Sequence, residues 1–313
     1  MAVTGLSPRL DVPTSAARDR SRWLWPALAA PGLLWLLVCF IVPLYVVLCV
    51  VFGYSDPIFR TAVPVWNPLE WNPTQFTYVL SRIVGPNGVY GPALLRTAAY
   101  VLIASSLCLL IAFPVSYYVA RLSGKWKGIL LALLIAPFWI SYMMRMLAWV
   151  NLLQDDGLVN SILGFGGIFD PVHWLTGQPV VVVLGLAYGY VPFMILPLYA
   201  GLDRLPQSTL EAARDLGANR LSTFVRVTLP LCRPTMVAAV LLTCLPMLGD
   251  YFTNDLLSAS PKTAMVGNLI NDSVQAPGQT GQAGAFVMIV LLVALLPMLY
   301  YVRVMSRRDE VAS

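Results

Sequence analysis

The chain alternates between long apolar runs and shorter polar segments, which is the pattern of an integral membrane protein. Five runs reach or approach the roughly 17–25 apolar residues that a membrane-spanning helix needs. They occupy residues 24–53, 97–120, 128–144, 174–202 and 283–302. A sixth run, 234–249, is short by itself and completes a span only if Asp250 lies inside or near the bilayer. We therefore predict an all-α integral membrane protein with six transmembrane helices.

The first apolar run begins as a signal peptide does, soon after Arg18, Arg20 and Arg22. A signal peptide has an apolar core of about 7–15 residues and a cleavage site marked by small residues. Here 30 uncharged residues follow one another, and no such cleavage site stands out. We expect a retained anchor whose helix starts near Pro31, after a polar tail, 1–23, that lacks fixed structure.

The composition agrees with this class, because 58% of the residues are apolar and 11% are charged, against roughly 25% charged in soluble domains. Fifteen of the 20 Lys and Arg residues fall in 1–23, 121–127, 203–233 and the end of the chain from Arg303. Loops rich in Lys and Arg stay in the cytoplasm. We predict cytoplasmic termini, with tails 1–23 and 304–313 flanking one transmembrane domain, 24–303.

Motifs for catalysis are absent from the sequence. It has no G-x-x-x-x-G-K-[ST] run to hold nucleotide phosphates and no G-x-S-x-G turn. His173 is the only histidine, and a lone histidine is poor evidence for a metal site. The five cysteines lie in or beside apolar runs, where we expect small hydrophobic fillers and no disulfide framework. We predict no catalytic residues and no metal, so uphill transport would need energy from a separate subunit.

Two charged residues lie within or at the ends of apolar runs. Arg145 either extends its side chain to the lipid headgroups or faces the bundle interior and pairs with an acid. Asp250 either contacts a cationic solute or has a structural role between helices, because intramembrane acids usually face a cavity. In the fourth run, Gly185 and Gly189 form a small-xxx-small pair that allows another helix to approach closely.

The most polar stretch between spans is Glu211–Pro230, which has the character of two short helices. Ser208 followed by Glu211 fits a capping box that starts the first helix. Gly217 ends or bends that helix, and Asn219 or Ser222 starts a second one that runs up to Pro230. Each helix has an apolar side, formed by Leu210, Ala213, Leu216, Leu221, Phe224 and Val225. In a membrane protein such a pair is suited to docking a partner.

This stretch resembles the EAA loop of permease subunits from binding-protein-dependent ABC importers. That loop has Glu-Ala-Ala, three variable residues, Gly, a variable stretch and then Ile-x-Leu-Pro. The matching residues here are Glu211, Ala212, Ala213, Gly217, Val227, Leu229 and Pro230, with Val227 replacing the usual Ile. The resemblance implies that the cytoplasmic loop 203–234 couples the chain to an ATPase.

The resemblance covers roughly residues 30–303. Within the family, this part of the chain is similar to the polyamine branch, the spermidine/putrescine permeases of the first-subunit type. The segments that carry it are 113–121, 136–160, 190–205, 248–257 and 265–270. It implies a type I ABC importer (MetI-like) permease fold. Candidates for the substrate path are Asp250, Tyr251, Arg145, Trp139 and Tyr190. Related permeases carry other organic cations, iron, sulfate or sugars, so the solute class stays open here.

The implied partners are a second permease subunit in a heterodimer, an ABC ATPase dimer that binds ATP and Mg, and an extracytoplasmic solute-binding protein. The implied location is the inner or plasma membrane of a bacterial cell, within the lipid bilayer.

Two other classes remain to be weighed. A membrane-bound DNA-binding regulator would use the helix–Gly–helix stretch, with the five Arg of segment 203–233, as a helix-turn-helix. That stretch is tethered at both ends and lacks a third helix, so we expect no nucleic-acid partner. A membrane enzyme would need a catalytic constellation that the sequence does not offer.

Overall fold

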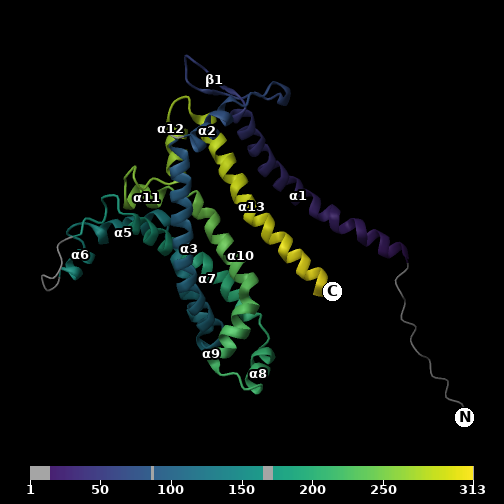
Figure 1. Ribbon diagram of the computed structural model, residues 1–313. Coiled ribbons are helices and arrows are strands. Elements are labelled where there is room, and N and C mark those ends of the chain that lie inside the picture. The colour runs from purple at the N-terminus through teal and green to yellow at the C-terminus, as the bar shows by residue number, and fades with distance from the viewer. Residues whose placement is uncertain (1–14, 86–87, 165–171, 313) are drawn as a thin grey trace, which may run out of the picture.

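The computed structural model describes residues 15–85, 88–164 and 172–312, which fold mainly into helices (Figure 1). Five long helices form its framework: α1 (Ser15–Val51), α3 (Tyr90–Arg121), α7 (Pro179–Asp203), α10 (Leu229–Leu248) and α13 (Thr280–Ala312). Each of them contains, or continues, a stretch that is long and apolar enough to cross a membrane. The predicted all-α membrane fold is therefore confirmed, and five of the six predicted spans are continuous helices.

The third predicted span is not straight. It is divided into α4 (Lys127–Ile135), the 3-10 turn η3 (Ala136–Trp139) and α5 (Tyr142–Leu153), and its two halves are bent by 86°. Pro137 lies at the start of η3, and Ile140 has an extended backbone. Proline removes a backbone N–H donor and interrupts a regular helix. The described residues therefore hold six spans only if this bent pair counts as one.

The fifth predicted span is extended at its N-terminal end, whereas we expected it to be extended at its C-terminal end, through Asp250. The helical stretch runs over 29 residues from Arg220 to Leu248 and ends before Asp250. It joins α9 (Arg220–Thr223), the π turn η4 (Phe224–Thr228) and α10 without a break. The expectation that a separate loop helix ends at Pro230 is therefore wrong. The wider π turn directly before Pro230 accommodates a proline that cannot donate an i→i−4 bond.

Helix α1 begins earlier than predicted. It starts at Ser15, whereas the stretch of membrane-spanning length within it starts at Leu28. Adding residues to an existing helix costs far less than starting one, so the helix continues beyond the apolar run. The prediction of an unstructured tail is wrong for residues 15–23, and residues 1–14 lie outside the described part. At the other terminus α13 likewise continues through the predicted tail to Ala312.

Two short strands lie at the end of the molecule opposite α8 (Gln207–Asp215) (Figure 1). An antiparallel ribbon pairs β1 (Tyr54–Ser55) with β2 (Ala62–Val63). The other short helices are η1 (Pro68–Glu70), α2 (Thr74–Val84), η2 (Gly124–Trp126), α6 (Leu158–Leu163), α11 (Phe252–Leu257) and α12 (Val266–Gln275), of which η2 lies between α3 and α4.

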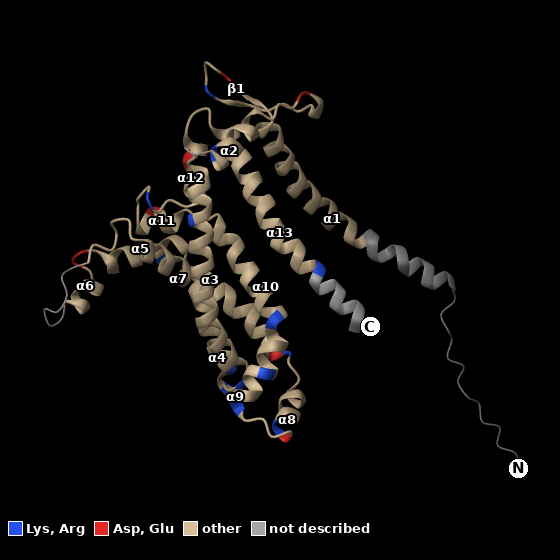
Figure 2. Cartoon of the chain, viewed as in Figure 1, with Lys and Arg blue, Asp and Glu red and all other residues tan. Residues whose placement is uncertain are grey.

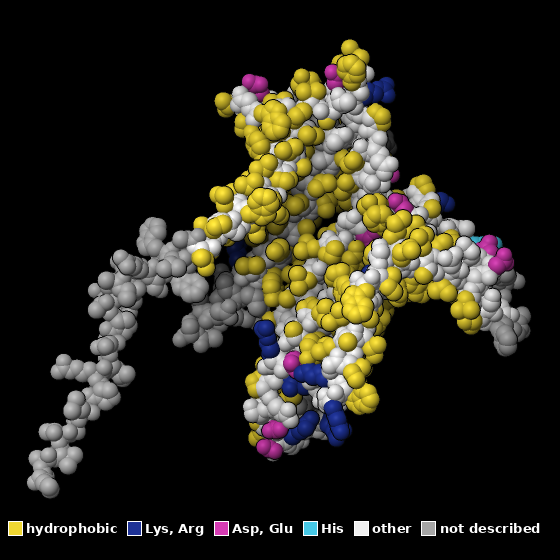
Figure 3. Space-filling model, turned by 180° about the vertical axis from the view of Figure 1, so that it is seen from behind, with side chains coloured by type: hydrophobic (Ala, Val, Ile, Leu, Met, Phe, Trp, Pro, Cys, Tyr) yellow, Lys and Arg dark blue, Asp and Glu magenta, His cyan; other side chains and the backbone are white. Residues whose placement is uncertain are grey.

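The core lies between α3, α7 and α10. Along α3, Ala104, Cys108 and Ala112 repeat every four residues and are fully buried. Small side chains at this spacing let two helices pack closely in a membrane. The Ser116 hydroxyl crosses to α7 and donates to the Ile195 carbonyl over 3.0 Å. In contrast, α1 and α13 lie to one side and expose most of their apolar side chains (Figure 3).

Candidate functional site

The loop with the Glu-Ala-Ala motif begins with α8, which starts at Gln207, two residues earlier than a capping box at Ser208 predicts. Pro206 precedes the helix, and no side chain caps its first turn. Ser208 is therefore the second residue of the helix, and Glu211 lies too far along to complete a capping box. The capping-box prediction is wrong. Pro206, whose φ is fixed, has an extended backbone directly before the helix, so the helix starts at Gln207.

The end of α8 agrees with the sequence. Gly217 has a φ of +86°, its N–H donates to Arg214, and the N–H of Ala218 donates to Ala213. These two bonds form a Schellman motif, in which glycine adopts the left-handed conformation that other residues rarely take. Asn219 then starts α9, and its side chain accepts from the Ser222 N–H over 2.7 Å. Both predictions, a helix end at Gly217 and a new start at Asn219, are confirmed.

The apolar side chains of this loop are divided between packing and exposure. Leu210 is buried, and Phe224 packs edge-on against Phe113 and Tyr117 at the end of α3. Leu216 and Leu221 are instead 90% and 72% exposed. The loop is thus held to the bundle by one set of apolar residues and presents a second set outward.

Charged side chains surround the exposed leucines (Figures 2 and 3). Glu211 and Ala212 are exposed on α8, whereas Val227, Leu229 and Pro230 are half-buried where η4 meets α10. The motif therefore has two parts, an exposed first half at the tip and a packed second half that continues into a span. A surface of this kind, apolar with a charged border, is typical of a protein–protein contact.

The ends of α3 and α7 are tied together behind the loop. The Arg121 guanidinium donates from Nη2 to the carbonyls of Leu202 and Leu205, each over 2.6 Å. These carbonyls belong to the last turn of α7 and its exit, where helix carbonyls lack helical partners. Lys127 forms an ion pair with Asp203 at 2.6 Å. These contacts fix the start of the loop to the ends of α3 and α4.

A second polar site surrounds Asp250, between α10 and α11. Its side chain is only 6% exposed. Oδ2 accepts from the Tyr142 hydroxyl over 2.7 Å and from the Thr253 hydroxyl over 2.6 Å. Oδ1 accepts from the Thr253 backbone N–H over 3.1 Å. Both carboxylate oxygens are thus hydrogen-bonded, as a buried charge requires.

The two interruptions of the helical spans meet at this site. Tyr142 is the first residue of α5 after the 86° bend, and Asp250 follows the end of α10. Gly189 makes room for the Tyr142 ring, because a Cβ there would lie 2.5 Å from a ring carbon. A Cβ at Gly185 would lie 2.4 Å from the Leu257 side chain. The two glycines therefore allow α5 and α11 to pack closely against α7.

The predicted substrate-path residues are only partly brought together. Tyr190 lies beside Asp250, with its ring 5.5 Å from that of Tyr142. Trp139 lies in the η3 turn and is 87% exposed. Tyr142 and Thr253 were not predicted. Thr253 follows Asp250 by three residues, the spacing of a helix-start contact that the sequence could have indicated.

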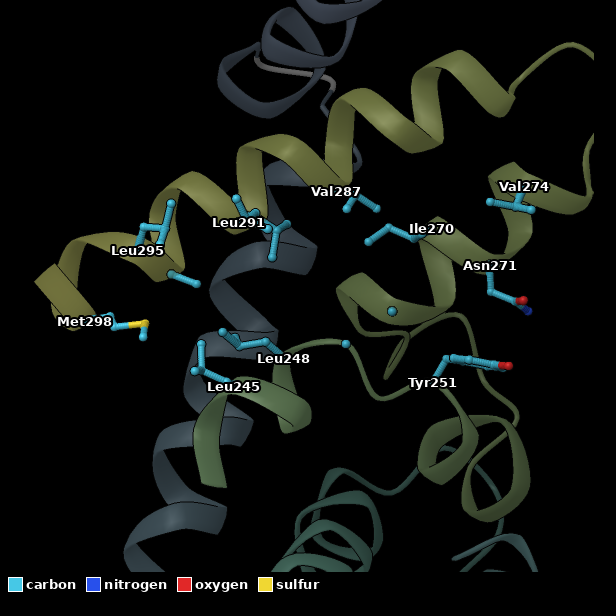
Figure 4. A pocket seen from close by; sticks show the side chains of 14 residues that line it. Leu245, Leu248, Tyr251, Ile270, Asn271, Val274, Val287, Leu291, Leu295 and Met298 are labelled. Carbon is cyan, nitrogen blue, oxygen red and sulfur yellow. The ribbon is translucent and has the colours of Figure 1, made fainter. Parts of the chain in front are cut away.

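Tyr251 faces a different space from its neighbour Asp250. It lines an apolar groove of about 620 Å³ between α10, α12 and α13, together with Leu248, Asn271 and Leu291 (Figure 4). On α11, Asp255 accepts from the Asn268 amide over 2.6 Å. Burial raises the pKa of Asp255, the Asn268 bond lowers it, and the nearby charges of Asp272 and Asp250 raise it.

Arg145 is only 8% exposed and lines an apolar groove between α3, α4, α5 and α7. Among the described residues, the expected acidic partner is not within ion-pair distance of Arg145. Its guanidinium carbon lies 5.5 Å from the centre of the Tyr142 ring, a cation–π distance. Elsewhere in the described ranges, His173 pairs with Asp155 at 2.9 Å on the surface, and no group of three possible metal ligands occurs.

Residues 112–308 match the family model described as "Binding-protein-dependent transport system inner membrane component". The chain is 36% identical over 190 residues to the spermidine/putrescine transport system permease protein PotB of Escherichia coli K12, covering 61% of this chain and 68% of that protein. The PotB of Haemophilus influenzae is 35% identical over 217 residues, covering 69% and 75%. A bacterial alginate ABC transporter, solved with a periplasmic protein bound to an alginate pentasaccharide, contains a chain of similar fold. Its TM-score is 0.67 at 20% identity, over 93% of this chain and 97% of that one.

Proposed function

Because this chain belongs to the family of inner membrane components of binding-protein-dependent transport systems, we propose that it is a permease subunit of an ATP-driven importer for polyamines. The observation that carries the solute class is the identity of 35–36% to permeases named for spermidine and putrescine. Permeases of this family are transport components of the bacterial inner membrane, and not enzymes. ATP hydrolysis then takes place in a separate subunit.

The surroundings of Asp250 support a cationic solute. Asp250 and Asp272 both lie close enough to Asp255 for their charges to act on it, and several negative charges suit a molecule with several ammonium groups. The hydroxyls of Tyr142 and Thr253 hold the Asp250 carboxylate in place. We propose that an ammonium group of the solute replaces one of these hydroxyls as it passes, with Tyr190 and Tyr251 beside the path and Trp139 at its edge. Arg145 carries the wrong charge for a polyamine and lines another surface.

The exposed tip of the loop supports coupling to an ATPase. We assign this role to Glu211, Ala212, Ala213 and Gly217, with Leu216 and Leu221 buried on docking. Val227, Leu229 and Pro230 then transmit movement of the tip into α10, since α9, η4 and α10 form one continuous helix. ATP and Mg bind to that ATPase dimer in this proposal.

The complete transporter in this proposal holds a second, different permease subunit, the ATPase dimer and an extracytoplasmic solute-binding protein. In this proposal both termini lie in the cytoplasm, because 15 of the 20 Lys and Arg residues fall in the four segments on that side. Those of the loop gather around α8 and α9 (Figure 2). The exposed apolar faces of α1 and α13 would be covered by lipid and by the second permease.

The test of this function is reconstitution of the assembled transporter with its binding protein in liposomes. We expect spermidine or putrescine to stimulate ATP hydrolysis and to accumulate inside ATP-dependently. Alginate oligosaccharide, sulfate and ferric iron, added with the same binding protein, serve as controls and should not do so. Stimulation by one of these and not by polyamines would contradict the solute class. ATP hydrolysis by this chain alone would contradict the subunit assignment.

A further inference from the structure

Arg145 is an exception among the charged residues of the bundle. It lies on α5, is only 8% exposed, and its Nε has no hydrogen-bond partner. The ion pairs within the described ranges join Lys127 to Asp203 and His173 to Asp155, so no carboxylate there neutralises it. Its one close contact is the face of the Tyr142 ring. A buried charge without a counter-ion is unfavourable and in membrane proteins usually marks a function.

The guanidinium lines a groove of about 400 Å³ whose other walls are almost entirely apolar. The groove lies between α3, α4, α5 and α7, and its lining includes Ile111, Leu133, Leu184, Val191 and Ile195. Ile111, Leu133 and Leu184 are exposed, so that the groove opens on the outer surface of the bundle. Trp149, another lining residue, lies one helical turn beyond Arg145 on α5. The groove therefore combines one cation with a long apolar channel.

The length and direction of the groove fit one leaflet of a bilayer. Its residues on α7 extend from Leu184 to Ile195, which at about 1.5 Å per residue is roughly 16 Å. One leaflet contributes about half of the 30 Å hydrocarbon core. Trp149 and Tyr142 of α5 contact α7 at Tyr188 and Gly189, within this range, where the third span bends by 86° (Figure 1). Tyr142, on which the cation stacks, also contacts Asp250 just beyond the end of α10. The cation therefore lies near the end of a membrane-spanning helix, and tryptophan is enriched at such ends.

We propose that this groove binds an anionic phospholipid of the bilayer, in the leaflet remote from the coupling loop. The lipid phosphate accepts hydrogen bonds from the Arg145 guanidinium, which is the side chain best suited to phosphate. One acyl chain lies along α4 and α7. A headgroup without an ammonium group, such as phosphatidylglycerol, is preferred, because an ammonium would approach a second cation at Arg145.

The bound lipid acts on the bend of the third span. Arg145 stacks on Tyr142, and Tyr142 donates to Asp250. A phosphate that holds Arg145 also holds the Tyr142 ring in position. Occupation of the groove therefore stabilises the contact between α5 and the start of α11. This inference goes beyond the proposed transport of polyamines and holds for any solute.

The chain offers a matched control. Arg82 on α2 also lies over a tyrosine ring, with its guanidinium carbon 5.4 Å from the centre of Tyr78. It lies outside the apolar groove, beside Asp272. Arg145→Gln and Arg82→Gln thus each remove one arginine–tyrosine contact. Only the first of these removes the cation from the proposed lipid site.

The experiment measures lipid retained by the assembled transporter in detergent, by native mass spectrometry, during titration with phosphatidylglycerol. We expect Arg145→Gln to raise the half-saturating concentration about tenfold or more, since a hydrogen bond to a charged group is lost. Arg82→Gln should stay within about threefold of the wild type, and Arg145→Lys, which keeps the charge but loses the planar fork, should fall between Arg82→Gln and Arg145→Gln. Phosphatidylcholine should bind more weakly, and inorganic phosphate should not compete, which distinguishes a lipid from free phosphate. Equal retention by the wild type and Arg145→Gln would overturn the proposal, as would equal binding of the two lipids or competition by inorganic phosphate.

A second variant covers the case in which Arg145→Gln fails to assemble. Val191→Trp fills the channel and keeps the cation, and we expect it to lose the same lipid molecule. Retention of that lipid by Val191→Trp would overturn the proposed position of the acyl chain. Leu184→Cys tests whether the second permease covers the groove instead. A membrane-soluble maleimide should label it in the assembled transporter, and phosphatidylglycerol added beforehand should slow that labelling. Complete protection without that lipid would overturn the proposal in favour of a subunit interface.

Discussion

The coupling loop and the Asp250 site both place an acid next to apolar residues, but the acid is exposed in the loop and buried in the Asp250 site. Glu211 is exposed at the tip of α8 beside Leu216, which is 90% exposed. Asp250 is buried, and three hydrogen bonds hold its two oxygens. The loop has a surface without an intramolecular partner, whereas the buried site is complete without a ligand. A change at the loop should therefore affect coupling alone, and a change at Asp250 should affect stability as well as transport.

Leu216→Asp should have the largest effect and tests the loop side of this contrast. Burying a leucine in a partner contributes about 1.5–3 kcal/mol, so we expect ATP-driven uptake to fall by roughly 10- to 100-fold. Membrane insertion and thermal stability should not change, because Leu216 packs against nothing in the chain. Leu69→Asp is the control, since Leu69 is 94% exposed at the opposite end. Equal uptake by both variants would contradict the docking role, and Glu211→Lys should behave as Leu216→Asp does.

Asp250→Asn tests the buried side. Removing the charge while keeping the shape should raise the KM for spermidine about tenfold, because a hydrogen bond between charged groups is worth about 1.5–3 kcal/mol. Tyr142→Phe removes a neutral donor and should change the KM by less than about threefold, while it lowers stability by about 1 kcal/mol. Uptake assays and thermal unfolding of both variants separate the two roles. An unchanged KM and rate for Asp250→Asn would remove Asp250 from the path.

Gly189→Ala tests the packing around the Asp250 site without changing a polar group. The new Cβ would lie 2.5 Å from the Tyr142 ring, and overpacking of this kind costs about 1–3 kcal/mol. We expect lower thermal stability, because the Tyr142 ring must shift. A weaker hydrogen bond from Tyr142 to Asp250 and slower transport should follow. Gly128→Ala on α4 is the matched control, because nothing lies within 4 Å of its Cβ position. Equal stability of the two variants would show that α5 can move away from α7 without loss.

Asn219→Ala should have the smallest effect. It removes the side-chain bond to the Ser222 N–H, and loss of such a cap costs about 1 kcal/mol. We expect faster hydrogen exchange over 220–224 and uptake within about twofold of the wild type, because the rest of this helix is continuous with α10. Loss of uptake as large as that of Leu216→Asp would show that the start of α9 itself contacts the ATPase.

Much of the coupling loop could be predicted because its determinants are local. Gly217 and Asn219 act through backbone conformation and contacts to residues three or four positions away, so their roles follow from spacing. The capping box at Ser208 failed for a reason that is also local, since Pro206 moved the helix start. The continuity of α9 with α10 was missed because two prolines at 230 and 234 indicated an end, and a π turn accommodated them.

The Asp250 site shows the limit of such prediction. The sequence alone determined that an acid follows the fifth span and that a glycine pair allows a close neighbour. Only the tertiary structure decided which residues meet Asp250, because Tyr142 reaches it through a bend and across 108 positions of the chain. It also left Arg145 facing a tyrosine ring and an apolar groove, where the sequence suggested an acid. Such pairings depend on how helices cross in space, and the hydropathy of a single span does not indicate those crossings.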